Sequence, residues 1–532
     1  MFTWELWFAI VPGLILFLYG IDHFSKEIQR VAGERFRSVL GKLTKHPLGG
    51  TTLGAIVTAI IQSSTATTVI AVGLVDAGTI SFAQSLGIMF GANIGTTVTA
   101  QLVAFKLTIF APFFILLGFV ISLFGGRYKF LGKPIFYFGL VFFSLALISE
   151  AIIPFKDNPE FLSMFSHLSN VFVAIFVGII ATLILQSSSV TTGIVVLLAG
   201  TGLLTLGQGI PVILGANIGT TATSLLAASR MDLHARRASI AHFLFNVGGV
   251  LIFLPFITIF TSFVEGIGGN LAQQVANAHL IFNLSAATIF LLMLNHFKLL
   301  IEKLVPGTED EIIFKTNYLE NGPPINNRQA FDFIEKELVH SIDVTLKLFD
   351  ESIGFLKNNK GRSFQRVTKL EAFNDFLDEK IEQAILKLSG KKLSEKEARK
   401  TVLLVRMSNM VEQLGDRADD LAYLSVELNE RGGSLSPESM VELDQLYEQF
   451  CKNILILRES IPKISLANIK KMRKNDIAFR LLLNVSYQKH LERLYLQKAY
   501  AGTFFVETLS TLEQANAHVR EIRKLSELYR KS

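Results

Sequence analysis

Two short polar motifs each occur twice inside apolar sequence. The first is Gln-Ser-Ser followed by Thr or Ser, at Gln62 and at Gln186; the second is Gly-Ala-Asn-Ile-Gly-Thr-Thr, with its asparagine at Asn93 and at Asn217. The offset between the copies is the same for both motifs, because 186 − 62 = 124 and 217 − 93 = 124. Two polar motifs at one fixed offset indicate an internal duplication whose halves together build one site.

Charge divides the chain into two parts. Residues 1–300 hold 15 Lys and Arg and 10 Asp and Glu, which leaves 51 − 15 = 36 and 45 − 10 = 35 for the remaining 232 residues. The sequence therefore predicts a membrane domain (1–304), a linker (305–327) and a charged, water-soluble domain (328–532). The basic excess of the first part lies in short loops, as expected in a lipid bilayer, and gives no reason to expect nucleic acid as a partner. The single Cys451 suits a reducing compartment.

The apolar segments around the Gln-Ser-Ser motifs are too short to cross a bilayer. Gly49 to Ile61 would form roughly 20 Å of helix, against a hydrocarbon core of ~30 Å. We therefore expect a re-entrant hairpin with the motif at its tip, and a second such hairpin around Gln186. The glycines of the other motif favour a break in each following span, Gln84 to Lys106 and Gly207 to Ser229.

Loop charges predict the orientation of the chain. If each hairpin returns to its own side, the basic loops lie inside, the N-terminus is external and the C-terminal domain is cytoplasmic. Three crossings then separate the two hairpins, so the repeats at about 6–124 and 135–263 have inverted topology. The expected fold is all-α: a multi-pass protein of the cell membrane with two inverted repeats, each with a re-entrant hairpin and a broken helix, and a helical bundle after them.

The hairpin tips have the chemistry of an anion site. Free N–H groups at the start of a half-helix and nearby hydroxyls can bind an anion, and no Lys or Arg lies near the motifs. A cation must then help to neutralise the anion, and freed carbonyls, hydroxyls and amide oxygens at the second motif suit Na+. Small residues that only permit close helix packing would not explain why Gln and Asn recur at fixed places. The expected substrate-binding residues are Gln62, Ser63, Ser64, Thr65, Gln186, Ser187, Ser188 and Ser189, and the expected sodium ligands are Asn93, Thr96, Thr97, Asn217, Thr220 and Thr221.

This pattern resembles the type II sodium–phosphate cotransporters. Both motifs match in both copies, His242-Phe-Leu-Phe-Asn246 matches as well, and the resemblance covers about residues 10–300. It implies import of inorganic phosphate coupled to Na+ by alternating access, with phosphate between the hairpin tips and no enzymatic activity. Two alternatives stay open: a membrane-anchored phosphate sensor in which the soluble domain signals, and a Na+-coupled symporter of another tetrahedral oxyanion.

Few ionisable groups occur within the apolar segments. Asp76 is either a coupling residue or a helix cap at the interface. Asp22 follows the first span, where an interfacial position is expected. His242 is expected to pack with a hydrogen bond, with proton relay as the alternative.

The soluble domain has the 3.6-residue periodicity of helices. Breaks near 358–362, 390–393, 431–437 and 465–468 predict a bundle of five or six antiparallel helices. A homo-oligomer and a cytoplasmic signalling partner of this bundle are both compatible with the sequence.

One acidic motif stands out in this bundle. Met410 to Asp420 resembles the PhoU signature, and its acidic residues Glu412, Asp416 and Asp420 have i, i+4, i+8 spacing. Charges so spaced repel unless a cation lies between them. The resemblance implies a regulatory domain that holds a divalent or iron-type metal at these three residues; the alternative is a solvated face relieved by neighbouring arginines. A second motif near Leu512 is degenerate, so a second cluster there is not expected.

Overall fold

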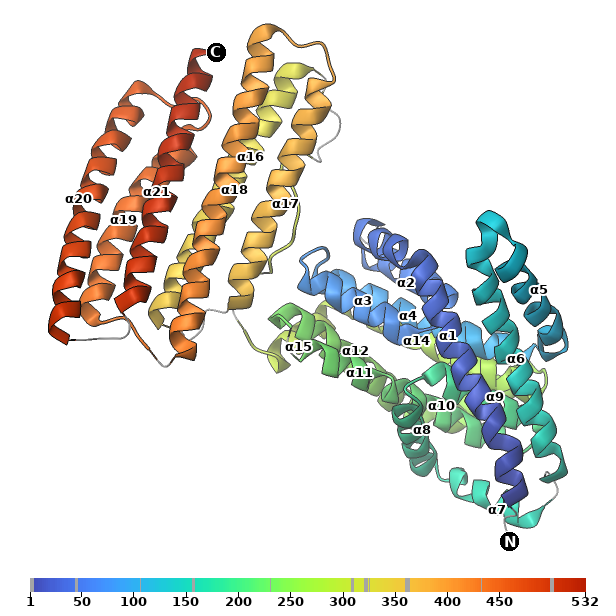
Figure 1. The fold of residues 1–532 in the computed structure, drawn as a ribbon. Coiled ribbons are helices and arrows are strands. Elements are labelled where there is room, and N and C mark those ends of the chain that lie inside the picture. The colour runs from blue at the N-terminus through green and yellow to red at the C-terminus, as the bar shows by residue number, and fades with distance from the viewer. Residues whose placement is uncertain are drawn as a thin grey trace. The chain divides into compact units, whose positions relative to one another are not determined.

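The computed structural model is helical throughout its described part. It describes residues 4–43, 46–105, 107–155, 158–229, 231–307, 311–319, 324, 326–358, 364–431, 433–497 and 502–532. Within these residues there is no strand, and six helical segments are long and apolar enough to cross a membrane. The prediction of an all-α, multi-pass membrane protein is therefore confirmed. The chain separates into two units, Met1–Glu311 and Ile312–Ser532 (Figure 1).

The first repeat contains a long entry helix and a hairpin of two short ones. Its helices are α1 (Trp4–Leu43), α2 (Pro47–Ile61), α3 (Ser64–Asp76), α4 (Phe82–Ala104) and α5 (Ala111–Phe124). The predicted first span and the basic stretch after it form one helix of 40 residues. Ion pairs one turn apart support its second half: Lys26 lies 2.7 Å from Asp22, and Arg30 lies 2.7 Å from Glu27.

The second repeat also has a long helix, a hairpin of two short helices and further apolar helices, with additional short helices and a split in the span after the hairpin. Its helices are α6 (Gly132–Ile152), α7 (Pro159–Ser166), α8 (Val171–Leu185), α9 (Ser188–Thr201), α10 (Leu206–Gly219), α11 (Thr221–Ala228), α12 (Leu233–Phe253) and α13 (Ile257–Ile267), followed by α14 (Leu271–Leu292) and α15 (Leu294–Leu304). Short 3-10 segments lie at Leu107–Phe110, Gly126–Leu131, Ile153–Phe155, His167–Ser169 and Leu254–Phe256. Asp232 accepts a hydrogen bond from the N–H of Ala235 and so starts α12 earlier than the apolar pattern predicts.

The structure corrects the predicted break at the first glycine motif. Helix α4 runs without interruption through 91–97, whereas the second copy ends α10 and begins α11 at Thr220. The glycines serve close packing instead: a Cβ added at Gly91 would lie 2.0 Å from the carbonyl oxygen of Thr51 on α2. At Gly215 it would lie 2.0 Å from the carbonyl oxygen of Ile175 on α8. Each hairpin therefore lies directly against the helix that carries the glycine motif.

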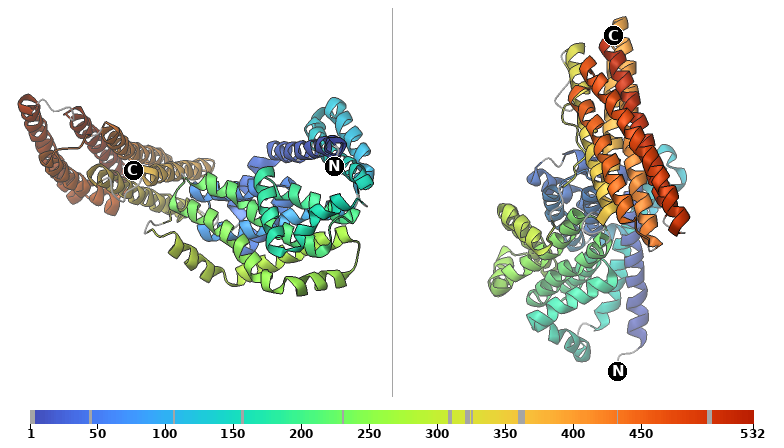
Figure 2. Two further views of the ribbon diagram at one scale, coloured as in Figure 1. Left: turned by 90° about the horizontal axis from the view of Figure 1, so that it is seen from below. Right: turned by 90° about the vertical axis from the view of Figure 1, so that its left-hand side faces the viewer.

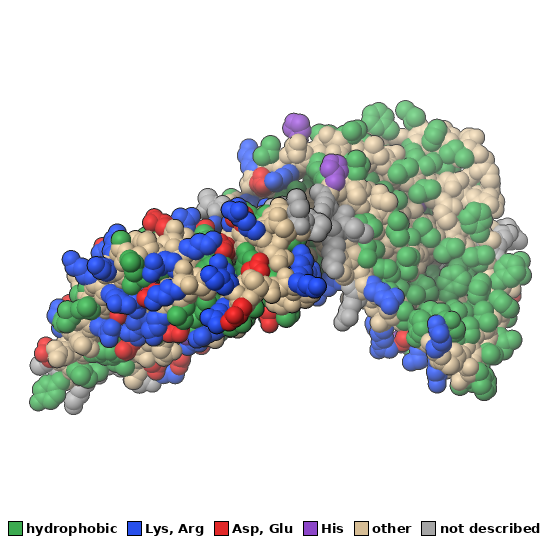
Figure 3. Space-filling view, turned by 90° about the horizontal axis from the view of Figure 1, so that it is seen from above, with side chains coloured by type: hydrophobic (Ala, Val, Ile, Leu, Met, Phe, Trp, Pro, Cys, Tyr) green, Lys and Arg blue, Asp and Glu red, His purple; other side chains and the backbone are tan. Residues whose placement is uncertain are grey.

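The membrane unit contains two groups of closely packed helices. Helix α1 packs along α6, and α6 along α5, around buried residues such as Phe17 and Leu145. The other group joins the hairpins to α4, α10, α12 and α14, and includes a cluster of the aromatic rings of Phe90, Phe245 and Phe290. The segment that ends with α5 is only 11% buried, and Figure 3 shows an apolar surface over this unit. Such a surface suits a lipid bilayer.

The second unit is a bundle of six helices within the described residues. They are α16 (Asn327–Asn358), α17 (Phe364–Ser389), α18 (Glu395–Glu430), α19 (Pro437–Ser460), α20 (Leu466–Gln497) and α21 (Gly502–Lys531), and they lie side by side around one apolar core (Figure 2). Ser394 and Ser436 cap α18 and α19 at two of the predicted breaks. Most of the break at 358–362 and much of the linker at 305–327 lie outside the described residues.

Candidate functional site: two hairpin tips and two side-chain clusters

Both hairpins turn in the same way. Gln62 and Gln186 adopt left-handed backbone conformations, with φ of 60° and 53°, which non-glycine residues rarely do. The next serine caps the outgoing half-helix: the Ser63 hydroxyl accepts from the N–H of Ala66 at 3.2 Å, and Ser187 repeats the arrangement. The remaining N–H groups at the start of α3 and α9 are the donors expected at a hairpin tip.

A threonine pair ties the two arms of each hairpin together. The hydroxyl of Thr58 donates to that of Thr67 at 2.8 Å, and the hydroxyl of Thr182 donates to that of Thr191 at 2.9 Å. All four side chains are buried, and the two pairs are 124 residues apart. These bonds hold each tip in its turned conformation.

The two tips meet. The hydroxyl of Thr99, on α4, donates to the side-chain oxygen of Gln62 at 2.6 Å and lies 3.5 Å from the hydroxyl of Ser189. Ser189 in turn donates to the backbone oxygen of Gln62 at 3.5 Å. Residues of the two repeats, more than 120 positions apart, thus share one hydrogen-bonded contact.

A cavity of ≈ 440 Å³ lies between the tips. All eight predicted substrate-binding residues line it, together with Thr220 and a short stretch of α1. No Lys or Arg is among its lining residues in the part of the chain that the structure describes. The wall is therefore made of hydroxyls, amides and half-helix starts.

One lining residue carries an ionisable side chain. Asp22, expected at the interface, lines the cavity and pairs with Lys26 at 2.7 Å. Because Lys26 already compensates this carboxylate, the pair adds little net charge to the cavity wall. Asp76, by contrast, accepts a hydrogen bond from the N–H of Asp232 at 2.9 Å, which favours the capping role over the coupling role.

The two motif asparagines lie in matching side-chain clusters. Asn93 donates to the Asn246 side chain at 2.7 Å, and its oxygen lies 3.3 Å from Nε2 of His242. Asn217 donates to the Asn283 side chain at 3.1 Å, and its oxygen lies 3.3 Å from Nε2 of His279. These partners occupy both ends of each amide. The asparagines are therefore held in place by hydrogen bonds, and their role as sodium ligands stays a prediction, because each histidine takes only one of the two lone pairs of the amide oxygen.

The sequence alone did not reveal the partners of Asn217. His242 was expected to form a packing hydrogen bond, but His279 and Asn283 were not singled out. The signal was present as His-x-x-x-Asn, which occurs at His242 and again at His279. In both copies the asparagine also donates to the backbone oxygen of its histidine, at 3.0 and 2.9 Å.

The predicted sodium ligands are only partly gathered. Of the six, Thr220 alone lines the cavity between the tips. The hydroxyls of Thr96, Thr97 and Thr221 donate to carbonyls of their own helices, which leaves their lone pairs for another partner. Because α4 is continuous, the first motif does not free its carbonyls as expected.

Two further threonines are candidates that the sequence did not reveal. Thr68 and Thr192 are almost fully buried, at 0% and 1% exposure, and lie 124 residues apart. Their hydroxyls have no hydrogen-bond partner among the described residues. A buried hydroxyl without a partner costs free energy unless a ligand satisfies it.

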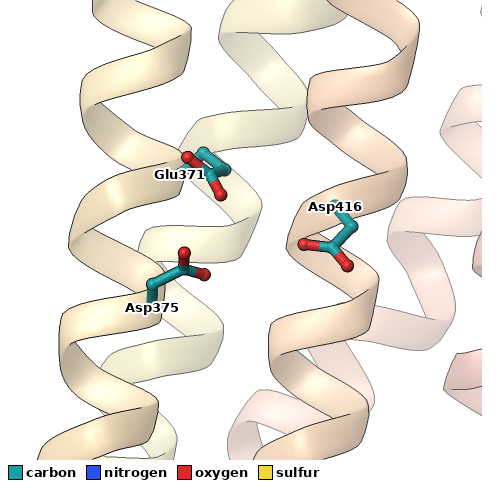
Figure 4. Close-up of side chains that lie close together, drawn as sticks. All are labelled: Glu371, Asp375 and Asp416. Carbon is teal, nitrogen blue, oxygen red and sulfur yellow. The ribbon is translucent and has the colours of Figure 1, made fainter.

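In the bundle, three carboxylates from two helices lie together. Oxygen atoms of Glu371 and Asp375 on α17 and Asp416 on α18 lie within 4.8 Å of one another (Figure 4). The second acidic helix was missed by sequence reasoning, although Glu371 and Asp375 have the spacing of Glu412 and Asp416. A set of carboxylates from two facing helices can bind a metal ion.

One predicted metal ligand points elsewhere. Asp420 pairs with Arg417 at 2.7 Å and is about half exposed, whereas burial and the neighbouring charges of Asp420, Asp416 and Asp375 raise the pKa of Asp419. At about 100° per residue, a residue seven positions on stays nearer the same helix face than one eight positions on. Asp420 is therefore not among the three carboxylates that lie together, and its role as a metal ligand stays a prediction.

The acidic group is electrostatically strained. Burial, and then neighbouring carboxylates, raise the pKa of Glu371 and of Glu412 to about 7 and that of Asp419 to about 6. The same causes raise the pKa of Asp416. A bound cation would relieve this repulsion.

Comparison with known proteins gives related sequences. The family model described as Na+/Pi-cotransporter matches twice, over residues 16–150 and 160–295. YqeW of Bacillus subtilis is 34% identical over 296 residues, which cover 55% of this chain and 96% of that protein. YjbB of Escherichia coli, named for inorganic phosphate export, is 24% identical over 512 residues, 92% of this chain and 91% of that protein.

A human protein is similar over a shorter segment. Sodium-dependent phosphate transport protein 2B of Homo sapiens is 38% identical over 117 residues, which cover 21% of this chain and 17% of that protein. No solved structure matches the chain.

Proposed function

Because the chain belongs to the Na+/Pi-cotransporter family, we propose that it carries inorganic phosphate across the cell membrane together with Na+. The observation that carries this proposal is the cavity lined by both hairpin tips and by no Lys or Arg of the described chain. Two half-helices begin at this cavity, and their N–H groups and dipoles favour an anion. The hydroxyls of both tips add further donors to phosphate oxygens.

The missing positive charge explains coupling. A multiply charged phosphate held only by neutral donors binds weakly until a cation enters, because the charge of Lys26 is already taken up by Asp22. Na+ prefers oxygen ligands, and the buried hydroxyls of Thr68 and Thr192 are available for it. Phosphate then binds with substantial affinity only when Na+ is bound, which is the physical basis of symport.

Alternating access is the proposed transport mechanism. Helices α1, α5 and α6 form one packed group, and the hairpins with α4 and α10 form another. Helix α1 contributes Tyr19, Asp22 and Ser25 to the cavity wall, so a shift between the two groups would open and close the cavity. The proposed orientation has the N-terminus outside, the bundle in the cytoplasm and the two repeats inverted.

The proposed direction is import, because Na+ normally moves down its gradient into the cell. The relative named for phosphate export, which matches 92% of this chain, favours export as the second candidate. Radiolabelled phosphate flux in proteoliposomes, with Na+ gradients imposed in either direction, separates the two. Import predicts that phosphate follows the Na+ gradient. Efflux against an inward Na+ gradient would support export.

The same flux measurement distinguishes a symporter from a phosphate sensor and from a carrier of another solute. Flux that does not respond to Na+ contradicts the proposed symport. Phosphate binding without any flux would support a membrane-anchored sensor. Competition by sulfate or arsenate at concentrations similar to those of phosphate would support a carrier of another tetrahedral oxyanion.

We further propose that the bundle is a PhoU-like regulatory domain with a divalent or iron-type cation at its acidic group. Glu371, Asp375 and Asp416 would hold it, because their oxygens lie within 4.8 Å of one another, and Glu412 lies one helical turn before Asp416. Metal analysis of the purified full chain tests this. Wild-type protein should retain metal, and the double variant E371Q/D416N should not; equal metal content in both contradicts the site.

A further inference from the structure

The bundle also contains an internal duplication. Positions 101 residues apart are buried in pairs, such as Phe349 and Phe450, since 450 − 349 = 101, and Leu404 and Phe505. The offset relates α16 to α19 and α18 to α21. Between α17 and α20 it becomes 102, which aligns further buried positions: Leu370 with Met472, Leu377 with Phe479 and Ile381 with Leu483. Each half of the bundle is therefore a copy of one three-helix unit.

The two halves differ in charge at several corresponding positions. At these offsets, three acidic residues of the first half correspond to arginines of the second half. The pairs are Glu371 with Arg473, Asp378 with Arg480, and Asp419 with Arg520. Two other acidic positions, Asp375 and Asp416, correspond to the uncharged Ile477 and Ala517. Glu412 corresponds to Glu513 and keeps its charge, so the change of sign is confined to those three positions.

One buried carboxylate organises these arginines. Asp476 is 7% exposed and accepts a hydrogen bond from Asn516 at 2.8 Å. It also pairs with Arg480 at 2.5 Å and with Arg520 at 3.7 Å. Asp476 therefore holds an arginine of α20 and an arginine of α21 close to each other.

The arginines exceed the carboxylates that face them. The only other acidic partner among the described residues of this cluster is Glu527, 3.7 Å from Arg473 and also 3.2 Å from Lys531. Arg523 is half-buried, and its Nη1 has no hydrogen-bond partner in the described part of the chain. Burial and the charge of Arg473 both lower the pKa of Arg523. Four arginines against two carboxylates leave a local excess of about two positive charges.

We propose that Arg473, Arg480, Arg520 and Arg523 form a binding site for a phosphate-type dianion. Guanidinium groups bind tetrahedral oxyanions through paired N–H donors, and a dianion would balance the excess charge. Arg473 and Arg480 are 61% and 55% exposed, so the site is open to a small anion. Free inorganic phosphate and the phosphate of an anionic lipid share this chemistry. With the proposed transport function, such a site would let the bundle respond to the transported solute.

Hydrogen exchange with mass spectrometry tests the site in the full-length chain. The variant Q62A/Q186A supplies a background in which the transport cavity is impaired. Inorganic phosphate should protect peptides within 466–497 and 502–531, and R473Q should weaken the apparent affinity about tenfold, as expected for a lost charge-assisted hydrogen bond. R458Q is the matched control, because Arg458 pairs with Asp343 outside the cluster and is similarly exposed.

A second set of measurements determines whether the ligand is free inorganic phosphate or a lipid headgroup. The detergent-solubilised protein with inorganic phosphate is compared with nanodiscs that contain either neutral or anionic lipid. Protection by inorganic phosphate supports a soluble ligand, and protection that requires anionic lipid supports a headgroup. Protection by neither, or equal protection in R473Q and R458Q, overturns the proposal. Exchange at the hairpin tips is measured on separate peptides, so failure of the transport proposal would be recognised independently.

Discussion

The two units of this chain both contain internal repeats, but the repeats differ in what they share. In the membrane unit, the copies share polar residues at an offset of 124: glutamine at the turn, serine at the cap and threonine pairs between the arms. In the bundle, the copies share buried apolar positions, while three acidic positions of one copy are arginines in the other.

The difference follows from how each pair of copies is used. The two hairpin tips face one cavity, so both must offer the same neutral donors to the same solute. The halves of the bundle need only fit one core, and each has its own outward face. Shared chemistry therefore indicates a shared site, and diverged chemistry indicates two separate ones.

The largest effect is expected at the turns of the hairpins. Replacing either Gln62 or Gln186 by alanine should reduce phosphate uptake at least a hundredfold, because each glutamine lines the cavity and Gln62 also binds Thr99. The measurement is Na+-driven uptake in proteoliposomes at matched protein content. Gln208→Ala is the control, since Gln208 belongs to a helix cap outside the cavity. If one variant transported normally, the tips would not form one shared site.

Replacing the buried Thr68 and Thr192 should change the Na+ dependence of uptake more than its phosphate dependence. Thr68→Val and Thr192→Val should each raise the Na+ concentration for half-maximal uptake about tenfold, as expected when one ligand oxygen is lost. Folding should not suffer, because valine removes a buried hydroxyl that has no partner among the described residues. Thr58→Val is the contrasting control: it breaks a buried hydrogen bond and should cost about 1 kcal/mol of stability. Unchanged Na+ dependence in both valine variants would remove these residues from the proposed ion sites.

How much of this could be read from the sequence depends on the kind of feature. The hairpins were predictable, because the apolar segments before Gln62 and Gln186 are too short to span and end in polar tips. The break at the first glycine motif was predicted wrongly, because a glycine can serve either a break or a close approach. Only the position of Thr51 against Gly91 shows which applies.

Pairings between distant helices were not predictable from spacing alone. His279 and Asn283 gain meaning only when Asn217 is seen beside them. In the same way, Glu371 matches the motif spacing, but its approach to Asp416 depends on how α17 packs against α18. Periodicity predicts which residues share one face of a helix, whereas the helix that packs against this face is determined by the tertiary structure.

A smaller effect is expected from pH on the acidic half of the bundle. The folded-state pKa of Glu371 and Glu412 is about 7, above the usual value of 4.5, so the folded state binds more protons between these values. Stability of metal-free protein should therefore fall as pH rises from about 5 to 7. Hydrogen exchange of 364–389 and 395–430 measures this, and added divalent metal should remove the trend. The basic half, at 466–497, should show no comparable trend; if it did, the contrast between the halves would not be electrostatic.

The smallest effect is expected from the histidines that hold the motif asparagines. His242→Ala and His279→Ala should each lower phosphate uptake several-fold, and by similar amounts, because each removes one hydrogen bond from an asparagine that is still held by a second amide. His279→Gln should restore part of the activity, since glutamine can donate to Asn217 in place of the imidazole. His296→Ala, at an exposed site on α15, is the control. A loss confined to one histidine would show that the two asparagine clusters, although alike in geometry, do not contribute equally to one shared site.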